Sequence, residues 1–215
     1  MDSIKTIFLD WNGTICKNVF WQQLDNDSTK EIFEKIKKCL FIDNGNLIDP
    51  WMKNQLSMND IIDTISNETK INKQFLKEQL IFSSENMNFI NPENMNFINP
   101  EIPNIIKLIQ ERDIEVVLAS DNMDVFRYTI SKLKLDLLFD DLLLSNEIGF
   151  LKTEWTGNTS LFFKNYIKRK NLNLSECILI DDAKNLIDMC HDIGMQNLKI
   201  DNCHETINKL KIFLQ

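Results

Sequence analysis

The sequence predicts an α/β fold in which a parallel β-sheet core carries a separate helical segment. From residue 103 onward, short apolar stretches typical of buried strands alternate with amphipathic helical patterns. Such alternation indicates parallel βαβ units with right-handed crossovers. A further buried strand is expected at residues 6–9, where apolar and β-branched residues follow one another. Between these parts, residues 17–85 show helical periods throughout and no convincing strand.

The expected elements follow one another in a simple order. In the middle segment, Ser28 is a suitable N-cap for a first helix, whose apolar residues Ile32, Phe33, Ile36 and Leu40 recur on one face. Helices are expected at residues 28–40, 54–66 and 71–82, and then at 103–112, 124–134, 158–170, 183–193 and 204–213. Beyond the first strand, further strands are expected at residues 114–119, 142–144, 177–180 and 196–200.

Composition and charge limit the possible functions. The 215 residues suffice for one sizeable core, or for a core plus a small second domain, and the 43% hydrophobic and 26% charged content is ordinary for a globular protein. The net charge of -8 argues against non-specific nucleic-acid binding, which depends on neutralisation of phosphates by Lys and Arg. It is compatible with a phosphorylated substrate, because a bound metal ion can supply local positive charge.

Cysteine usage and hydropathy bear on the compartment. The five cysteines are odd in number and show no metal-ligand or redox spacing, which favours free thiols in a reducing environment. No basic region followed by an apolar run and a small-residue cleavage site is present, and no apolar stretch approaches the roughly 20 residues needed to span a bilayer. We therefore expect a cytoplasmic protein without a membrane partner. The oligomeric state stays open, with a monomer slightly favoured.

A perfect tandem repeat separates the helical segment from the α/β part. Residues 86–93 recur without change as residues 94–101. Two copies of so short a period do not make a solenoid. Loops at such a junction accept insertions at a small entropic cost, so we expect a lengthened linker that is neutral for function. The alternative is an extended loop that brings Phe89 or Phe97 over a pocket.

An aspartate stands at the end of the first expected strand. Asp10 follows the apolar residues 6–9, and Asn12 and Gly13 behind it favour a turn. Open α/β sheets bind their ligands at the carboxyl ends of their strands. Asp10 is therefore a candidate functional residue, although taken alone it is equally well explained as an aspartate that begins a turn.

Residues 10–14 (D-W-N-G-T) resemble the first motif, D-x-D-G-T, of the haloacid-dehalogenase (HAD) superfamily, with Asn12 in the place of the second Asp. Three later stretches are similar to the remaining motifs, in the order that the family requires. They are a strand ending in Ser at 115–120, a segment that delivers Lys152 at 145–152, and a strand ending in acidic residues at 177–182, followed by Gly194 and Met195. The resemblance covers residues 1–16 and about 101–200.

The resemblance implies a fold and a division into domains. It implies an HAD-like Rossmannoid core with a parallel sheet, formed by residues 1–16 and 101–215. An all-helical cap domain would be inserted at residues 17–85, and the duplicated linker would occupy 86–101. Such a cap would be a mobile lid over the active site. The plain alternative is a helical bundle packed rigidly on the core.

The resemblance also assigns chemical roles to residues at the expected strand ends. Asp10 would be the nucleophile and form an aspartyl-phosphate, while Lys152 would neutralise both the nucleophile and the phosphoryl group. Mg²⁺, which prefers hard oxygen ligands, would be held by Asp10, Asp182 and the backbone carbonyl of Asn12. Asp181 would be a further metal-site residue or a partner of Lys152. The remaining candidates would bind the substrate: Thr14, Ser120, Asp121 and Asn122.

Each of these residues has a plainer explanation when it is taken singly. Asp182 is a good helix N-cap, Ser120 is typical of a turn, and Lys152 is by default a solvated charge. Their joint occurrence at ordered strand ends is what favours the functional interpretation.

Asn12 decides between the functions that the resemblance allows. In typical phosphatases of the family the residue at this place protonates the leaving group, and an amide does not exchange a proton near neutral pH. Loss of this help costs typically about 10²–10⁴ in rate.

We therefore predict a Mg²⁺-dependent phosphomonoester hydrolase of a small phosphorylated metabolite, which is slow or uses another acid, such as Asp121 or a cap residue. The alternative is a degenerate phosphate- or partner-binding protein, and a weaker one is transfer to an acceptor other than water. The dehalogenase branch is disfavoured by the acidic pair at the fourth motif.

Overall fold

A computed structural model describes residues 4–88, 101–202 and 205–215. The expectations for residues 89–100, which make up most of the tandem repeat, therefore lie outside the described residues. Among the described residues, no helix combines the length and the apolar character that crossing a bilayer requires.

The core is a five-stranded parallel sheet with the strand order β3-β2-β1-β6-β7. Its strands are β1 (Thr6–Leu9), β2 (Glu115–Ser120), β3 (Asp141–Leu144), β6 (Cys177–Asp181) and β7 (Gln196–Lys199). Leu9 is in register with Leu118 of β2 and Ile180 of β6, so these strands end at the same edge of the sheet. The predicted parallel α/β fold is confirmed, with every expected strand within one residue of its position.

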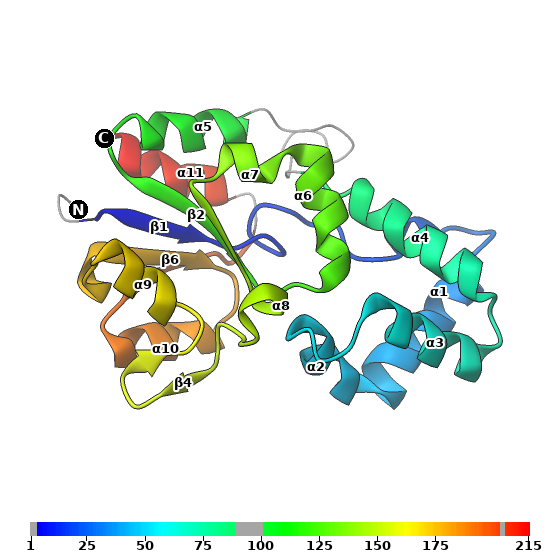
Figure 1. The fold of residues 1–215 in the computed structure, drawn as a ribbon. Coiled ribbons are helices and arrows are strands. Elements are labelled where there is room, and N and C mark those ends of the chain that lie inside the picture. Colours follow the sequence, from blue (N-terminus) through cyan, green and yellow to red (C-terminus); the bar gives the residue numbers. More distant parts are fainter. Residues whose placement is uncertain (1–3, 89–100, 203–204) are drawn as a thin grey trace.

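Helices cover both faces of this sheet, as Figure 1 shows. One face carries α5 (Glu101–Gln110), α7 (Leu135–Leu138) and α11 (Thr206–Lys211), and the other carries α9 (Lys164–Lys170) and α10 (Asn185–Ile193). Successive residues of a strand point to opposite faces. Ile7 and Leu9 accordingly join the cluster under α5 and α11, whereas Phe8 joins the cluster under α9 and α10.

The helical segment lies beyond the carboxyl ends of the strands (Figure 1). It contains α1 (Lys30–Lys37), α2 (Ile48–Met52), α3 (Met58–Thr69) and α4 (Lys73–Glu85). These helices share a hydrophobic cluster of their own, to which the core contributes Val125. Short 3-10 turns at Gln22–Leu24 and Gly45–Leu47 and a π-helix at Lys38–Asp43 connect them.

Three predicted helices differ from the structure. The helix expected at 54–66 spans Met58–Thr69 instead, because Ser57 caps its start by accepting from the N–H of Asp60. The helix expected at 28–40 begins at Lys30, so Thr29 and not the predicted Ser28 stands at the N-cap position. After Lys37 the backbone of this helix widens into the π-helix. The helix expected at 158–170 begins only at Lys164, because a small hairpin of β4 (Trp155–Thr156) and β5 (Thr159–Ser160) precedes it. The turn of this hairpin places Gly157 at a φ of 56°, a conformation that glycine adopts without steric cost.

Several short elements complete the core. They are the 3-10 turns Asp124–Phe126, Leu174–Glu176 and Ile212–Leu214, together with α6 (Arg127–Leu133) and α8 (Ser145–Ile148). Helix α6 follows the turn after β2 and stands between the sheet and the helical segment (Figure 1). Helix α8 follows β3 and leads into the loop that carries Lys152.

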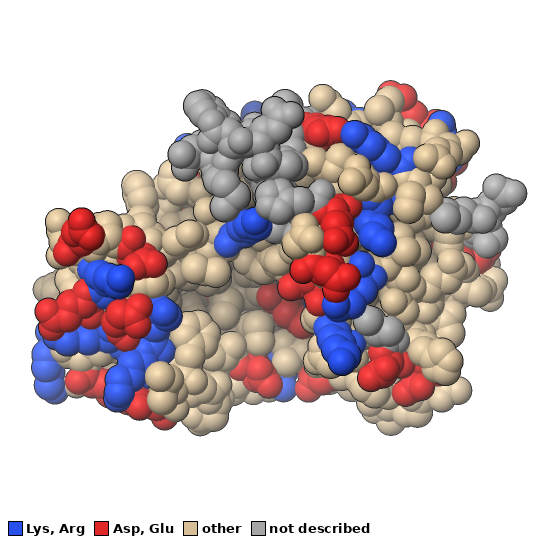
Figure 2. All heavy atoms as spheres, turned by 180° about the vertical axis from the view of Figure 1, so that it is seen from behind, with Lys and Arg blue, Asp and Glu red and all other residues tan. Residues whose placement is uncertain are grey.

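Charges of both signs are intermixed on the surface of the helical segment. Figure 2, seen from behind, shows acidic and basic side chains side by side on that part of the molecule. Several of them form ion pairs: Lys35 with Glu31, Lys37 with Glu34, and Lys38 with Asp43. On this face of the helical segment, basic side chains therefore stand beside acidic ones and pair with them.

Candidate active site

Three carboxylates meet at the carboxyl edge of the sheet. Asp10 follows β1 and Asp181 ends β6, and the two strands are neighbours in register. One oxygen from each of Asp10, Asp181 and Asp182 lies within 4.8 Å of the other two. Asp10 and Asp181 are each only 5% exposed, whereas Asp182 is exposed. Carboxylate oxygens gathered in this way are suitable ligands for a hard divalent cation.

Lys152 is buried between two of these carboxylates. Its Nζ donates to Asp10 Oδ1 at 2.7 Å and to Asp181 Oδ2 at 2.5 Å, and the residue is only 4% exposed. Its backbone N–H donates to Asp121 Oδ1 at 3.0 Å, which ties the Lys152 loop to the loop after β2. Lys152 is therefore a fixed internal cation beside Asp10, and the plainer explanation of a solvated surface charge does not hold.

Burial and charge shift the pKa values of the cluster. Desolvation raises the pKa of Asp10 to about 7, with the negative charge of Asp181 adding to the rise and Lys152 opposing it. Burial by itself lowers the pKa of Lys152, but the charges of Asp10, Asp181 and Asp121 outweigh this and raise it. Desolvation, followed by the charge of Asp181, raises the pKa of Asp182. One lysine does not neutralise three carboxylates, so the cluster favours a further cation.

Gly13 brings the turn after β1 against Asp182. Its φ is +81°, and a Cβ at this position would lie 2.3 Å from Asp182 Oδ2. Its N–H donates to the carbonyl of Cys16 at 2.8 Å, which closes the turn. Glycine is needed here for two reasons, because the backbone is left-handed and because no room exists for a side chain.

Asn12 joins the sheet edge to the start of the helical segment. Its Oδ1 accepts from Asn122 Nδ2 at 3.0 Å, and its Nδ2 donates to the carbonyl of Asn18 at 3.3 Å. The same Asn122 amide donates to Ser120 Oγ at 3.2 Å, while the backbone N–H of Asn122 donates to Ser145 Oγ at 2.9 Å. Ser120, Asn122 and Asn12 thus form one fixed polar group beside the carboxylates.

Thr14 lies apart from this group. It is fully buried, and its carbonyl accepts a hydrogen bond from Thr206 Oγ1 of α11 at 2.5 Å. Its hydroxyl has no hydrogen-bond partner among the described residues. The structure therefore places Thr14 in the packing behind the turn, and its role in substrate binding stays a prediction.

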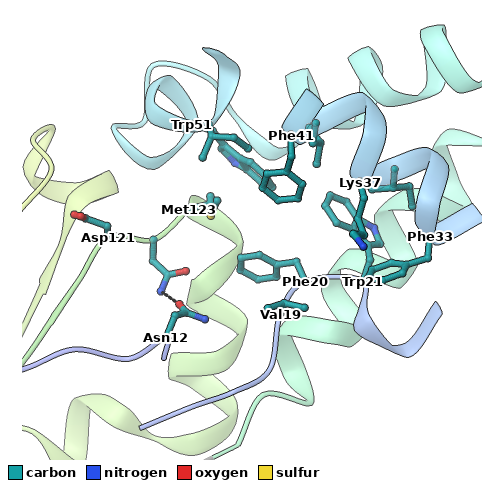
Figure 3. Close-up of a pocket in the computed structure, with 14 residues that line it drawn as sticks. Asn12, Val19, Phe20, Trp21, Phe33, Lys37, Phe41, Trp51, Asp121 and Met123 are labelled. Atoms are coloured by element: carbon teal, nitrogen blue, oxygen red, sulfur yellow. Dashed lines mark hydrogen bonds between the residues drawn. The ribbon is translucent and has the colours of Figure 1, made fainter. Parts of the chain in front are cut away.

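A cavity of about 500 Å³ opens beside the polar group. Its core side is formed by Asn12, Asp121, Asn122 and Met123, and its other side by residues of the helical segment, whose rings face the same space in Figure 3. The aromatic members are Phe20, Trp21, Phe33, Phe41 and Trp51. Trp21 and Trp51 are buried and also form part of this wall, whereas Trp11 packs on Phe126 with ring centroids 5.5 Å apart.

Comparison with solved structures identifies the fold. No protein-family model matches the sequence, and no curated protein matches it. A HAD family enzyme from Bacteroides thetaiotaomicron, in a magnesium complex, superposes with a TM-score of 0.67 at 16% identity, over 92% of this chain and 93% of that one. A predicted HAD-like family hydrolase from Porphyromonas gingivalis has a TM-score of 0.66 at 15% identity, over 99% and 98%. L-2-haloacid dehalogenase from Xanthobacter autotrophicus, with chloropropionic acid covalently bound, has a TM-score of 0.61 at 10% identity, over 92% and 77%.

The chain thus has the HAD-like fold, as the resemblance of its four sequence motifs predicted. At these identities the likeness concerns the fold, and the activity has to be argued from the site.

Proposed function

We propose that this chain is a Mg²⁺-dependent phosphomonoester hydrolase of the HAD type. The observation that carries the proposal is the buried Lys152, bonded to both Asp10 and Asp181 at the sheet edge. A fixed cation against a buried carboxylate suits a nucleophile that must approach an anionic phosphoryl group. Further support comes from the Bacteroides thetaiotaomicron enzyme. A second structure of that enzyme, in complex with magnesium and inorganic phosphate, superposes on this chain with a TM-score of 0.64.

The oxygen atoms of the cluster fit Mg²⁺. Asp181 has both carboxylate oxygens engaged, since Oδ2 accepts from Lys152 and Oδ1 accepts from the N–H of Ala183 at 2.8 Å. Asp182 is exposed and carries no such restraint from Lys152. We therefore assign Asp10 and Asp182 as direct ligands together with the backbone carbonyl of Asn12, and Asp181 as the residue that holds Lys152. Bound Mg²⁺ would supply positive charge against the phosphoryl oxygens.

The chain's own residues would divide the reaction between them. The Asp10 carboxylate attacks phosphorus and forms an aspartyl-phosphate, while the ester P–O bond breaks and its electron pair leaves with the alcohol oxygen. Lys152 would compensate charge on the nucleophile, and Ser120 and Asn122 are proposed as contacts of the phosphoryl oxygens. Water then attacks the same phosphorus, releases inorganic phosphate and restores the Asp10 carboxylate.

Asp121 is our candidate for the proton donor that Asn12 does not provide. It lines the cavity, and burial raises the pKa of its carboxyl group against the opposing charge of Lys152. A raised pKa favours the protonated form that a general acid needs. Asn12 would instead orient its neighbours through its amide hydrogen bonds.

We further propose that the segment 17–85 acts as the cap of this enzyme and residues 1–16 with 101–215 as its core. The cap side is attached to the core by several contacts. Trp51 Nε1 and the N–H of Met58 both donate to the Asp124 carboxylate at 2.9 Å, and Lys53 pairs with Glu154 at 3.1 Å. These contacts hold α2 and the start of α3 against the core beside the cavity.

A second candidate function is phosphate binding without turnover. Asn12 is the observation that favours it, because a carboxylate is missing at the acid–base position while the rest of the cluster is retained. This candidate predicts Mg²⁺-dependent phosphate binding together with no phosphate release from any ester.

The test is phosphate release from 4-nitrophenyl phosphate with and without Mg²⁺. This leaving group needs little protonation, so the missing acid should matter least. We expect Mg²⁺-dependent turnover that is lost in Asp10→Asn and retained in Asp192→Asn, a matched change at an exposed carboxylate of α10. Equal turnover in Asp10→Asn would contradict the assigned nucleophile. No turnover in the wild-type protein would favour the binding function.

A further inference from the structure

The cavity wall contributed by the helical segment is almost entirely apolar. The rings of Phe20, Trp21, Phe41 and Trp51 face the space in Figure 3, and the cavity lining continues to Asn12 and Asp121 at the sheet edge. Its volume of about 500 Å³ lies within the range of roughly 300–1,000 Å³ typical of small-molecule sites. A molecule bound at the carboxylates therefore has room to extend through the cavity toward this apolar wall.

The polar atoms of the wall are already engaged elsewhere. Trp21 Nε1 donates to the carbonyl of Leu76 at 3.2 Å, and Trp51 Nε1 donates to Asp124 Oδ1 at 2.9 Å. Lys37 pairs with Glu34 at 3.2 Å, and its Nζ lies 5.2 Å from the centroid of the Phe33 ring. A hydroxyl-rich organic group would find few partners here. Each buried hydroxyl left without a hydrogen bond weakens binding by a factor of about 5 to 150.

Part of the apolar wall is open to solvent at the rim. Phe41 is 63% exposed and Val19 is 52% exposed, although both line the cavity. Large apolar side chains exposed together around a cavity mark a place where an apolar ligand is bound. A hydrocarbon group seated against Phe41 would remove apolar surface from water on both sides of the contact, which is a direct source of affinity.

We propose that the ligand of this cavity is the organic part of a phosphate monoester of a hydrocarbon-like alcohol, alkyl or aryl. The phosphate would lie at Asp10 and Lys152 and the apolar group against the helical segment. The inference rests on the proposed function for the position of the phosphate, but the affinity of the wall for hydrocarbon is a separate property. Sugar and polyol phosphates are excluded as preferred ligands.

The first experiment measures binding without chemistry. A series of n-alkylphosphonates from methyl to hexyl is titrated calorimetrically in the presence of Mg²⁺, because phosphonates carry the anionic group and resist hydrolysis. Burial of one methylene group is expected to raise affinity about fourfold until the cavity is filled. Phenylphosphonate and glucose 6-phosphate complete the set, and the sugar phosphate should bind no better than methylphosphonate.

Two neighbouring variants make the test specific to the wall. Phe41→Ala removes a ring that lines the cavity, and Ile42→Ala is its matched control, because Ile42 is 76% exposed and lies outside the lining. Phe41→Ala should weaken hexylphosphonate binding about three- to tenfold and leave methylphosphonate unchanged. Ile42→Ala should change neither. Both positions are exposed, and a thermal melt of each variant verifies the fold.

The outcomes separate this inference from the proposed hydrolase. Affinity that does not rise with chain length, absence of phosphonate binding, or tighter binding of glucose 6-phosphate would overturn the apolar-ligand inference. Equal effects of Phe41→Ala on both phosphonates would do the same. Rising phosphonate affinity without release of phosphate from hexyl or phenyl phosphate would overturn the hydrolase and leave the apolar site standing.

Discussion

A methyl group added at Gly13 should displace the Asp182 carboxylate while leaving the fold intact. The added Cβ would lie 2.3 Å from Asp182 Oδ2 and 2.5 Å from its Cγ. Ordinary contacts are about 3.5 Å, so the carboxylate must retreat by about 1 Å. Metal-ligand distances tolerate about 0.2 Å. We therefore expect Gly13→Ala to lower Mg²⁺ affinity by at least about tenfold, an effect comparable with the loss of a group that orients a ligand.

The same substitution has a stability cost that the control must remove. Alanine at a φ of +81° costs about 1–2 kcal/mol, or roughly 2–8 °C in melting temperature for a chain of this size. Gly194, the C-cap of α10, has a φ of +76° and no atom within 4 Å of an added Cβ. Gly194→Ala should therefore show a similar loss of stability with unchanged Mg²⁺ affinity.

The assay is a calorimetric Mg²⁺ titration of both variants, paired with thermal melts in the presence and absence of the ion. Specific loss of Mg²⁺ binding in Gly13→Ala is the expected result. If Gly13→Ala binds Mg²⁺ as the wild type does, then Asp182 is not a ligand or the turn relaxes freely. If both glycine variants lose affinity equally, the effect belongs to general strain, and the argument from the close approach fails.

Three further predictions follow from the site and its attachment to the helices. Lys152→Met should lower the free energy of unfolding, measured in urea without Mg²⁺, by about 3–5 kcal/mol, because it leaves two buried carboxylates uncompensated. A loss below about 1 kcal/mol would contradict this expectation. Asp121→Asn should slow the release of phosphate from alkyl phosphates by about 10²-fold and leave the hydrolysis of 4-nitrophenyl phosphate unchanged, because only the poor leaving group needs a general acid. Equal slowing with both substrates would refute that role of Asp121. Trp51→Phe should lower the free energy of unfolding in urea by about 1.5–3 kcal/mol, because it removes the N–H donor to the Asp124 carboxylate. An unchanged unfolding midpoint would show that this hydrogen bond adds nothing to stability.

Local sequence patterns determined the sheet and the places where its chemistry gathers. Residues such as Ile7, Phe8 and Leu9 are all apolar, which indicates a strand buried on both faces and hence a parallel sheet covered by helices on each side. The end of each apolar run also marks the end of a strand. Asp10 and Asp181 were placed at one edge for this reason, because parallel strands in a single sheet end on the same side.

Only the tertiary structure decided how those side chains are engaged. Lys152 stands 142 positions from Asp10 in the chain, and nothing in its own loop distinguishes a solvated lysine from one buried between two carboxylates. The hidden position of Thr14 is likewise set by α11, which comes from the far end of the chain. The apolar cavity arises where helices of the middle segment meet the loop after β2. Sequence periodicity reports that a face is buried, whereas long-range packing decides what covers it and which part of it is left open for a ligand.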